Sequence, residues 1–400
     1  MTRIFSGVQE IDYPIIDSDA HVNEPPDLWV ANAPARLKDR VPKVIRGDNG
    51  DSWSYNEGAS TEPVSLYAAA GRNWLEYDQE GKTYDELRRG SWEPKARVQD
   101  MDIDGIYAAV VYPGVTLRGA KTYGDEPELQ KFCVRTYNEW VLDFGRQTGG
   151  RVIPQAVIPT TGVDDALAEL TWAVDSGHRG VVISRMPNGD FDPQPDDDRF
   201  WAMAQEADVP VGIHIGSFVR PNPNREWTGG TDVTKPAFLA LAAEKVAGTE
   251  TIPVCTEFLF SGLFEKFPRL KVLLVEAGIG WIPGVLEQCD DIFLRYRWFT
   301  GAVDRMQRMP SETFHRNFYS TFLKDKVGLD LRHHLNIDNI MWSTDYPHSV
   351  TDWPNSRINI ERFFRGIPAD EVKKMLHTNA KNLYRLDHIP DTVAELDVAV

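Results

Sequence analysis

One stretch decides how the chain folds: Ile15-Ile16-Asp17-Ser18-Asp19-Ala20-His21-Val22-Asn23-Glu24-Pro25. It begins with apolar residues, as a short buried strand does, and then becomes acidic and carries a histidine. Because alternate residues of a strand share a face, Asp17, Asp19 and His21 are predicted to point the same way. A carboxylate and an imidazole so placed can both reach one metal ion. The alternative is an Asp-rich cap in which His21 is merely hydrogen-bonded, and on this stretch alone the two interpretations are even.

Composition and charge exclude several classes of partner. The 400 residues are 42% hydrophobic and 26% charged, which is typical of a globular protein with a sizeable core. The net charge of −17 argues against a nucleic acid or an anionic membrane as partner. No stretch approaches the roughly 20 apolar residues of a membrane span, and residues 1–7 contain no apolar run of a signal peptide. Three unclustered cysteines predict reduced thiols in a cytoplasmic protein. With nucleic acid and membrane disfavoured, we expect a small-molecule substrate.

Residues 25–95 show no helix or strand period. Proline and glycine recur there among polar residues, together with aromatic residues such as Trp29, Trp53 and Tyr67. Long structured insertions of this kind are usually functional lids, although a disordered segment would look similar apart from its aromatic residues. We therefore expect an irregular insertion that forms part of a pocket wall and does not fold on its own.

From residue 96 onward the chain alternates between strands and helices. Apolar runs predict strands at 105–112, 152–158, 179–184, 209–215, 270–276, 317–321 and 339–344. Helical patterns predict helices at 96–103, 126–147, 163–176, 196–207, 236–247, 255–267, 281–299, 325–335, 355–365 and 369–376. Such alternation requires parallel strands, and eight units, counting the first strand, fit a closed barrel better than an open sheet. Residues 1–400 are thus expected to form a single (β/α)8 TIM-barrel domain with an N-terminal insertion after the first strand.

Ionisable residues follow four of the predicted strands, at the end where such a barrel carries its active site. They are Asp19 and His21 on the first strand, His214 on the fifth, Glu276 after the sixth, and Asp345 after the eighth, with His348 three residues on. A lone histidine at a strand end is more often a satisfied core residue than a ligand. Several ionisable groups at one end of a barrel would, however, be desolvated and repel one another without a cation. Two imidazoles and two carboxylates suit zinc, with manganese or iron as alternatives.

Other motifs are weaker. The stretch 274–283 contains Gly-x-Gly after a strand, but Pro283 stands where a dinucleotide-binding turn needs glycine or alanine. Arg118, Arg185 and Arg220 lie just beyond the second, fourth and fifth strands. Each could hold a substrate carboxylate, although a solvated surface arginine is the commoner role.

Three motifs together resemble the amidohydrolase-related family, in the branch that contains aminocarboxymuconate-semialdehyde decarboxylase and the resorcylate decarboxylases. They are Asp17-Ser18-Asp19-Ala20-His21, His214 and Trp342-Ser343-Thr344-Asp345-Tyr346-Pro347-His348, with further matches at 260–271 and 379–384. The resemblance covers nearly all of the chain outside 25–95. It implies a dimer and a single divalent metal ion, held on this chain by Asp19, His21, His214 and Asp345.

Two departures from the family pattern affect the expected chemistry. Many members carry His-x-His on the first strand, whereas this chain has Asp19 and His21; an acidic first ligand occurs in the resorcylate-type members. The family's sixth-strand histidine, which helps to activate water or substrate, is replaced by Glu276. A mechanism that depends on that imidazole cannot be transferred unchanged.

The sequence leaves three functions in competition. Hydrolysis is favoured: metal-activated water attacks a carbonyl-type carbon while Asp345 takes its proton. The alternative is non-oxidative decarboxylation of an aromatic or enol-like acid, with Asp345 delivering a proton to carbon. A barrel that only binds is disfavoured because every expected ligand is present. Loss of the sixth-strand histidine tips the balance towards hydrolysis, with Asp345, Glu276 and His348 as the catalytic set; for Glu276 the alternative is a helix cap.

Overall fold

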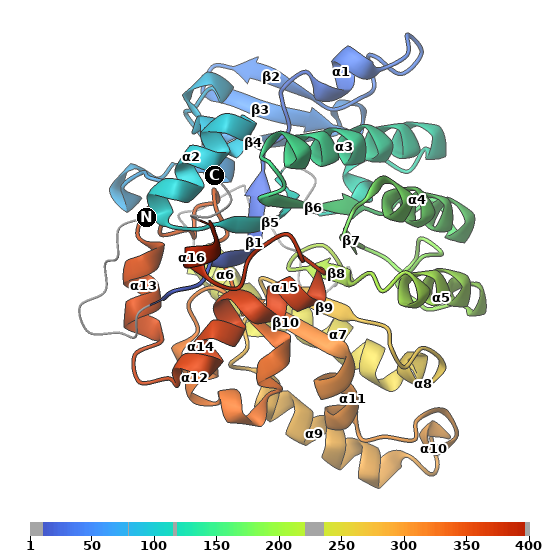
Figure 1. Cartoon of the computed structure of the whole chain (residues 1–400). Coiled ribbons are helices and arrows are strands. Elements are labelled where there is room, and N and C mark those ends of the chain that lie inside the picture. Colours follow the sequence, from blue (N-terminus) through green and yellow to red (C-terminus); the bar gives the residue numbers. More distant parts are fainter. Residues whose placement is uncertain (1–10, 79, 115–117, 221–235, 397–400) are drawn as a thin grey trace.

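The computed structural model describes residues 11–78, 80–114, 118–220 and 236–396 (Figure 1). Eight parallel strands form one sheet in the order β1-β5-β6-β7-β8-β9-β10-β11. Their bounds are β1 Ile16–Val22, β5 Ala108–Pro113, β6 Val152–Val157, β7 Gly180–Val182, β8 Val211–His214, β9 Val272–Val275, β10 Phe318–Phe322 and β11 Ile340–Trp342. All are buried along their length except at Tyr319. Both faces are covered, which is why these strands appear in the sequence as apolar runs rather than alternating patterns.

The two ends of the sheet meet and close the barrel. The Asp345 N–H donates to the Asp19 carbonyl oxygen at 2.8 Å, and the His21 N–H donates to the Tyr346 carbonyl oxygen at 2.6 Å. These bonds join β1 to the segment that directly follows β11. The predicted (β/α)8 TIM barrel is confirmed.

Helices surround the strands. They are α2 Pro94–Asp104, α3 Pro127–Gln147, α4 Val163–Ser176, α5 Asp198–Glu206, α6 Pro236–Glu244, α7 Thr251–Phe260, α8 Leu263–Lys266, α9 Ile282–Tyr296, α10 Ala302–Arg305, α11 Pro310–Asn317, α12 Lys326–Asp330, α13 Ser356–Phe363, α14 Ala369–Lys373, α15 Asn379–Leu383 and α16 Val393–Leu396. Figure 1 shows α3, α4 and α5 side by side outside the sheet, in agreement with their mutual contacts. The single helix predicted at 255–267 is wrong, because Gly262, with a φ of 79°, divides it into α7 and α8.

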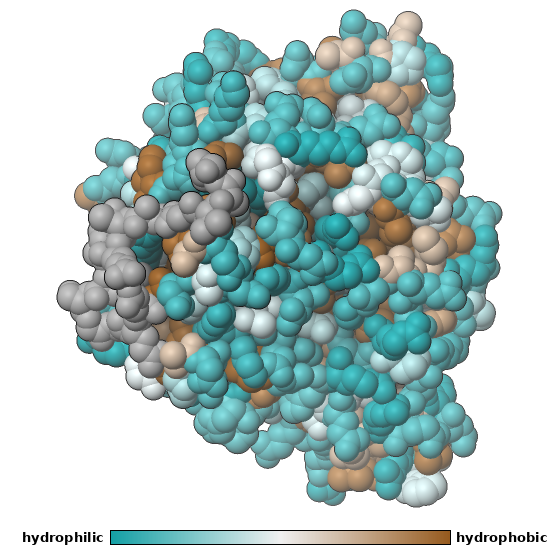
Figure 2. Space-filling model, in the orientation of Figure 1, coloured by the Kyte–Doolittle hydropathy of each residue, from teal (hydrophilic) through white to brown (hydrophobic). Residues whose placement is uncertain are grey.

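The outer surface agrees with the composition. Figure 2 shows a face that is mostly hydrophilic, with apolar residues in small separate areas. None of the described helices has the length and apolar character needed to cross a membrane.

The insertion is more regular than predicted. After α1 (Leu28–Asn32), the strands β2 (Lys43–Gly47), β3 (Gly50–Tyr55) and β4 (Ser60–Pro63) form an antiparallel sheet. The expectation of an irregular segment is therefore wrong for this part. The strands were missed because only β3 is substantially buried, so β2 and β4 show no hydrophobic period.

The insertion is anchored to the barrel by aromatic side chains. Trp29 is fully buried, donates from its Nε1 to the Cys133 carbonyl oxygen of α3 at 3.0 Å, and packs edge-on against Trp53 of β3. Tyr77 donates to the Ser349 carbonyl oxygen at 2.9 Å, beyond β11. These contacts place the insertion over the carboxyl end of β1.

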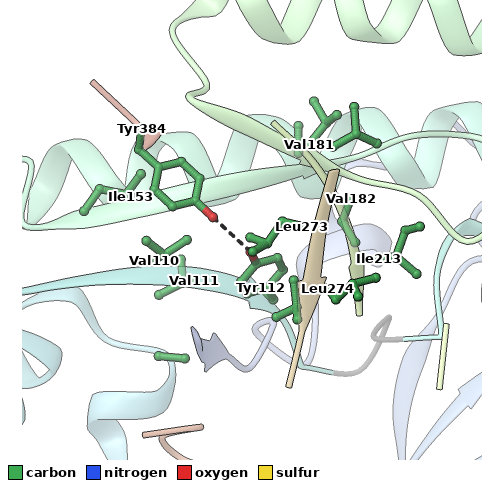
Figure 3. Close-up of a cluster of buried hydrophobic side chains, with 14 of the residues drawn as sticks. Val110, Val111, Tyr112, Ile153, Val181, Val182, Ile213, Leu273, Leu274 and Tyr384 are labelled. Atoms are coloured by element: carbon green, nitrogen blue, oxygen red, sulfur yellow. Dashed lines mark hydrogen bonds between the residues drawn. The ribbon is translucent and has the colours of Figure 1, made fainter. Parts of the chain in front are cut away.

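Two tyrosines fill the interior of the barrel. Tyr112 of β5 and Tyr384, which follows α15, meet with their hydroxyl oxygens 3.2 Å apart, as Figure 3 shows. The absence of a side chain at Gly180 helps to accommodate Tyr384, because a Cβ there would lie 3.1 Å from the Tyr384 ring. Tyr384, the last residue of the 379–384 motif noted in the sequence, thus has a packing role in the interior of the barrel.

Candidate metal centre

The predicted ligands gather at the carboxyl ends of the strands. Asp19 and His21 stand in β1, His214 is the last residue of β8, and Asp345 lies three residues beyond β11. Their side chains are 0–2% exposed. Residues more than 300 positions apart in the sequence are therefore brought into one buried group by barrel closure.

The predicted common face of the first strand holds only in part. The register of β1 against β5 shifts between Asp17 and Ala20, so the strict alternation is interrupted there. Asp17 is correspondingly absent from the group of possible ligands and serves another purpose. Its Oδ1 accepts from the Thr344 N–H at 2.9 Å, and its Oδ2 accepts from the Thr344 hydroxyl, so it ties β1 to the segment after β11.

Short distances connect the possible ligand atoms. His21 Nε2 lies 2.9 Å from Asp345 Oδ1 and 3.5 Å from Asp19 Oδ1. His214 Nε2 lies 3.5 Å from the same Asp19 oxygen. Asp19, His21 and His214 form one set whose ligand atoms all lie within 4.8 Å of one another, and His21, Asp345 and His348 form a second. The two sets share His21.

Backbone carbonyls orient both imidazoles. His21 Nδ1 lies 3.0 Å from the Pro113 carbonyl oxygen, and His214 Nδ1 lies 3.1 Å from that of Ile215. Because a carbonyl can only accept, each Nδ1 carries the hydrogen and each Nε2 presents a lone pair to the group, as in metal-binding histidines. Burial, helped by nearby His348, lowers the pKa of His21 to about 4, which favours the neutral ring that a metal ion requires.

The donor atoms lack partners of their own. Among the described residues, the buried atoms at this site without a hydrogen bond are Asp19 Oδ1 and Oδ2, His21 Nε2, His214 Nε2, Asp345 Oδ1 and His348 Nε2. Leaving several such atoms unsatisfied in a buried site would cost several kcal/mol. Carboxylate oxygens and imidazole nitrogens that converge without partners fit a divalent metal ion, which is the cofactor that the sequence predicts.

Asp345 is held as an anion by its neighbours. Burial alone would raise its pKa, but His348 and His21 outweigh burial and lower it, and His348 Nδ1 lies 3.1 Å from the Asp345 carboxylate. The His348 ring also stacks on the His21 ring at a centroid distance of 3.8 Å. His348 therefore lies beside both Asp345 and His21.

Glu276 lies beside the predicted ligands. Its Oε2 is 4.0 Å from His214 Nδ1, and its side chain is 16% exposed. Burial raises the pKa of Glu276 well above its usual value, and Asp345 and Asp19 raise it further against the opposing effect of Lys245. The residue directly follows β9, at the end of the barrel that holds the predicted ligands.

The two carboxylate residues that follow strands share an unusual backbone. Glu276 has a φ of 55° and Asp345 a φ of 54°, both in the left-handed region. For non-glycine residues this conformation costs of order 1 kcal/mol or more and is found disproportionately at active sites. The turn it produces is the local reason that both carboxylates leave their strands at the barrel mouth.

The three predicted substrate-binding arginines differ. Arg220 is exposed and held by Glu257 and Asp192, and Arg118 is exposed and paired with Glu62 at 2.9 Å. Both therefore fit the surface role that the sequence analysis kept open.

Arg185 is the remaining candidate. It is half-buried, lies over the Phe191 ring at 3.9 Å and bonds to backbone carbonyls; no carboxylate of a described residue pairs with it.

One contributor was missed by the sequence analysis. Tyr67, in the insertion, lies edge-on to the His348 ring at 5.9 Å and accepts at its carbonyl oxygen from the Asn23 side chain at 3.1 Å. Its aromatic type marked it as a possible pocket residue, but nothing in the pattern indicated which residue it would contact.

Comparison with known proteins agrees with this geometry. The chain is 27% identical over 310 residues to a gamma-resorcylate decarboxylase of Rhizobium radiobacter, covering 73% of this chain and 86% of that protein. The fold is shared with an amidohydrolase of Mycobacterium avium subsp. paratuberculosis, at a TM-score of 0.70 and 17% identity over 94% of this chain and all of that one. It is also shared with a dihydroxybenzoic acid decarboxylase of Polaromonas sp. JS666 with bound manganese and the inhibitor 2-nitroresorcinol, at a TM-score of 0.62 and 18% identity over 94% of this chain and 98% of that one. The amidohydrolase family profile matches residues 12–386. This protein is therefore a member of the amidohydrolase family.

Proposed function

We propose that this protein is a metal-dependent, non-oxidative decarboxylase of an aromatic or enol-like carboxylic acid. The observation that carries the proposal is the buried group of unpartnered ligand atoms on Asp19, His21, His214 and Asp345. The sequence favoured hydrolysis, but a relative that is 27% identical over 73% of the chain is named as a decarboxylase, which supports placing decarboxylation first. The acidic residue Asp19 in the first-strand motif is also the variant that the resorcylate-type members carry.

The proposed cofactor is one divalent metal ion. Zinc was the expectation from the ligand types, whereas a structural neighbour carries manganese. Carboxylate oxygens suit manganese, and a site with two carboxylates and two imidazoles accommodates either ion. We therefore propose manganese as the first metal to test and zinc as the second.

The residues divide the chemistry between them. The bound ion would supply positive charge that holds the substrate carboxylate and a neighbouring hydroxyl oxygen. Asp345, an anion in the free site, accepts a proton on substrate binding and passes it to the ring carbon that bears the carboxylate. The bond from that carbon to the carboxylate then breaks, carbon dioxide leaves, and the electron pair restores the aromatic ring. The proton that Asp345 takes comes from the substrate hydroxyl, so the product is left as an oxyanion; it regains a proton from solvent by way of His348, and Asp345 is again an anion for the next turnover.

Two further groups have proposed roles. Glu276, neutral in the buried site, would donate a hydrogen bond that orients the substrate hydroxyl, since a protonated carboxyl can donate. Arg185 would hold a polar substituent of the substrate at the edge of the mouth. The homodimer and the cytoplasmic location expected from the sequence remain proposals.

A single experiment separates the candidate functions. The manganese-loaded protein is incubated with a panel of hydroxybenzoates, amides and lactones, and carbon dioxide release and ring opening or hydrolysis are followed in parallel. We expect carbon dioxide from at least one hydroxybenzoate and loss of that activity in Asp345→Asn. Hydrolysis of an amide or lactone without carbon dioxide release would instead restore the hydrolase function that the sequence favoured.

A further inference from the structure

Arg97, in α2, is a charged side chain buried directly behind the metal centre. It is 1% exposed and lies outside the group of possible ligands. Its Nη1 donates to the carbonyl oxygen of His21 at 2.8 Å and to that of Gly90 at 3.3 Å. A guanidinium is rarely buried this completely, so its hydrogen bonds to the main chain of a predicted ligand require an explanation.

The main chain of His21 is held from both sides. Its N–H donates to the Tyr346 carbonyl oxygen at 2.6 Å, and its carbonyl oxygen accepts from Arg97. The register shift in β1 lies between Asp17 and Ala20, just before His21, which pairs with Tyr112 of β5. Arg97 thus adds a hydrogen bond to the main chain of one predicted ligand residue directly after the irregular part of the strand.

The same guanidinium lies on Tyr346, the residue after Asp345. Its Cζ is 4.4 Å from the centre of the Tyr346 ring, an attractive cation–π distance. The Tyr346 hydroxyl donates to Asp100 at 2.5 Å, and a Cβ at Gly90 would lie 2.5 Å from that hydroxyl oxygen. Arg97 therefore contacts both of the segments that bring His21 and Asp345 together.

The remaining donors of Arg97 face a small cavity. Its Nε and Nη2 have no hydrogen-bond partner among the described residues, and the cavity is lined by Asp17, Asp100, Asp104, Thr344 and Trp353 as well as Arg97. The space is about that of one water molecule, which would give these donors an acceptor. The carboxyl groups that line this cavity favour the positive charge of the Arg97 guanidinium beside them.

We propose that Arg97 is a positioning residue of the metal centre, which holds the main chain at His21 and Tyr346 so that His21 Nε2 and the Asp345 carboxylate keep their spacing. Arg97 touches neither substrate nor metal and acts through these two residues. The effect that replacing Arg97 has on turnover rests on the proposed function, whereas its effect on metal affinity does not.

The test compares Arg97→Met and Arg97→Lys with a matched control, Arg151→Met. Arg151 likewise donates to main-chain carbonyls, those of Tyr107 at 2.7 Å and Ile106 at 3.2 Å, and lies 5.0 Å from the Tyr107 ring. It does so before β5, at the opposite end of the barrel. Manganese is removed and titrated back, and its dissociation constant is measured at a temperature where circular dichroism shows every variant folded. The electron spin resonance spectrum of bound manganese reports the symmetry of the ligand group.

Arg97→Met is expected to weaken manganese binding 10- to 100-fold and to change the spectrum, as loss of a group that orients a ligand does. Arg97→Lys, which can still donate to the His21 carbonyl oxygen, should recover part of the affinity, and Arg151→Met should bind as the wild type does. Wild-type affinity and spectrum in Arg97→Met, or an equal loss in Arg151→Met, would overturn the proposal. If Arg97→Met does not fold, Arg97→Lys decides alone: unchanged affinity and spectrum overturn the proposal. If no hydroxybenzoate is decarboxylated by the wild type, the proposed function fails while the metal titration still decides the role of Arg97.

Discussion

Replacing His214 by alanine should remove most of the metal affinity of this protein. The imidazole is fully buried, its Nδ1 is fixed by the Ile215 carbonyl oxygen, and its Nε2 lies 3.5 Å from Asp19 Oδ1 without a hydrogen-bond partner among the described residues. Altering a group that merely orients a ligand costs about 10- to 100-fold in metal affinity. Removing a ligand outright should therefore raise the dissociation constant at least 100-fold, or about 2.7 kcal/mol.

The consequence for thermal stability can be worked out. At a free metal concentration 100 times the wild-type dissociation constant, binding stabilises the wild type by about 2.7 kcal/mol. The same concentration only equals the dissociation constant of His214→Ala, so it stabilises that variant by about 0.4 kcal/mol. The rise in Tm on adding metal should thus be largely absent from the variant.

The control is another buried histidine that lies away from the centre. His178 is 3% exposed and has its two ring nitrogens 3.3 and 3.2 Å from the carbonyl oxygens of Pro154 and Asn138. His178→Ala leaves a cavity of similar size and should lower the Tm with and without metal, yet it should keep the full rise on metal addition. A wild-type metal content and Tm rise in His214→Ala would refute its assignment as a ligand.

Three further predictions concern Glu276, Arg185 and the control residue His178. Glu276→Met, which cannot donate a hydrogen bond, should keep its metal and lose about tenfold or more in kcat, whereas Glu276→Gln, whose amide can still donate, should stay closer to the wild type; near-native kcat of Glu276→Met in steady-state assays would remove Glu276 from the catalytic set. Arg185→Ala should raise KM for a carboxylated substrate about tenfold or more while Arg220→Ala, whose guanidinium is already paired with Glu257, stays near the wild type, and equal KM values for both would remove Arg185 from the pocket. Burial lowers the pKa of His178 to about 4 from 6.5, so its neutral ring stabilises the fold above pH 6.5 and this contribution, about 3 kcal/mol, is lost as the pH falls towards 4. Urea unfolding should therefore show the stability difference between wild type and His178→Ala shrinking by that amount from pH 7 to pH 4, and a constant difference would mean that His178 is not held neutral.

Much of the barrel could be predicted from the sequence for a local reason. Strands buried on both faces, such as β9, must be apolar throughout, and the helices between them carry a 3.6-residue period, so each element is visible in its own residues. Asp19, His21, His214 and Asp345 were found because each stands at the end of such an element, and parallel strands present those ends at one mouth.

The sequence was less informative where contacts rather than periods set the structure. The strands β2 and β4 lie at the surface of the insertion and show no hydrophobic period, so they could not be seen. The resemblance to a family favoured a metal centre, but the absent sixth-strand histidine led the sequence analysis to rank hydrolysis above the decarboxylation that the relatives perform.

By itself, then, the sequence determined the eight-stranded architecture and the residues that meet at its mouth, because burial and strand order are written in local patterns. Only the tertiary structure decided how those residues are used. The bulge in β1 turns Asp17 from a possible ligand into the tie to Thr344, and the left-handed backbone at Glu276 and Asp345 places both carboxylates at the mouth. Arg97, an ordinary helix residue in the sequence, lies behind His21 because the fold packs α2 where its guanidinium reaches the His21 carbonyl oxygen. Such relations depend on distances between segments that the chain joins only by folding, so no local pattern encodes them.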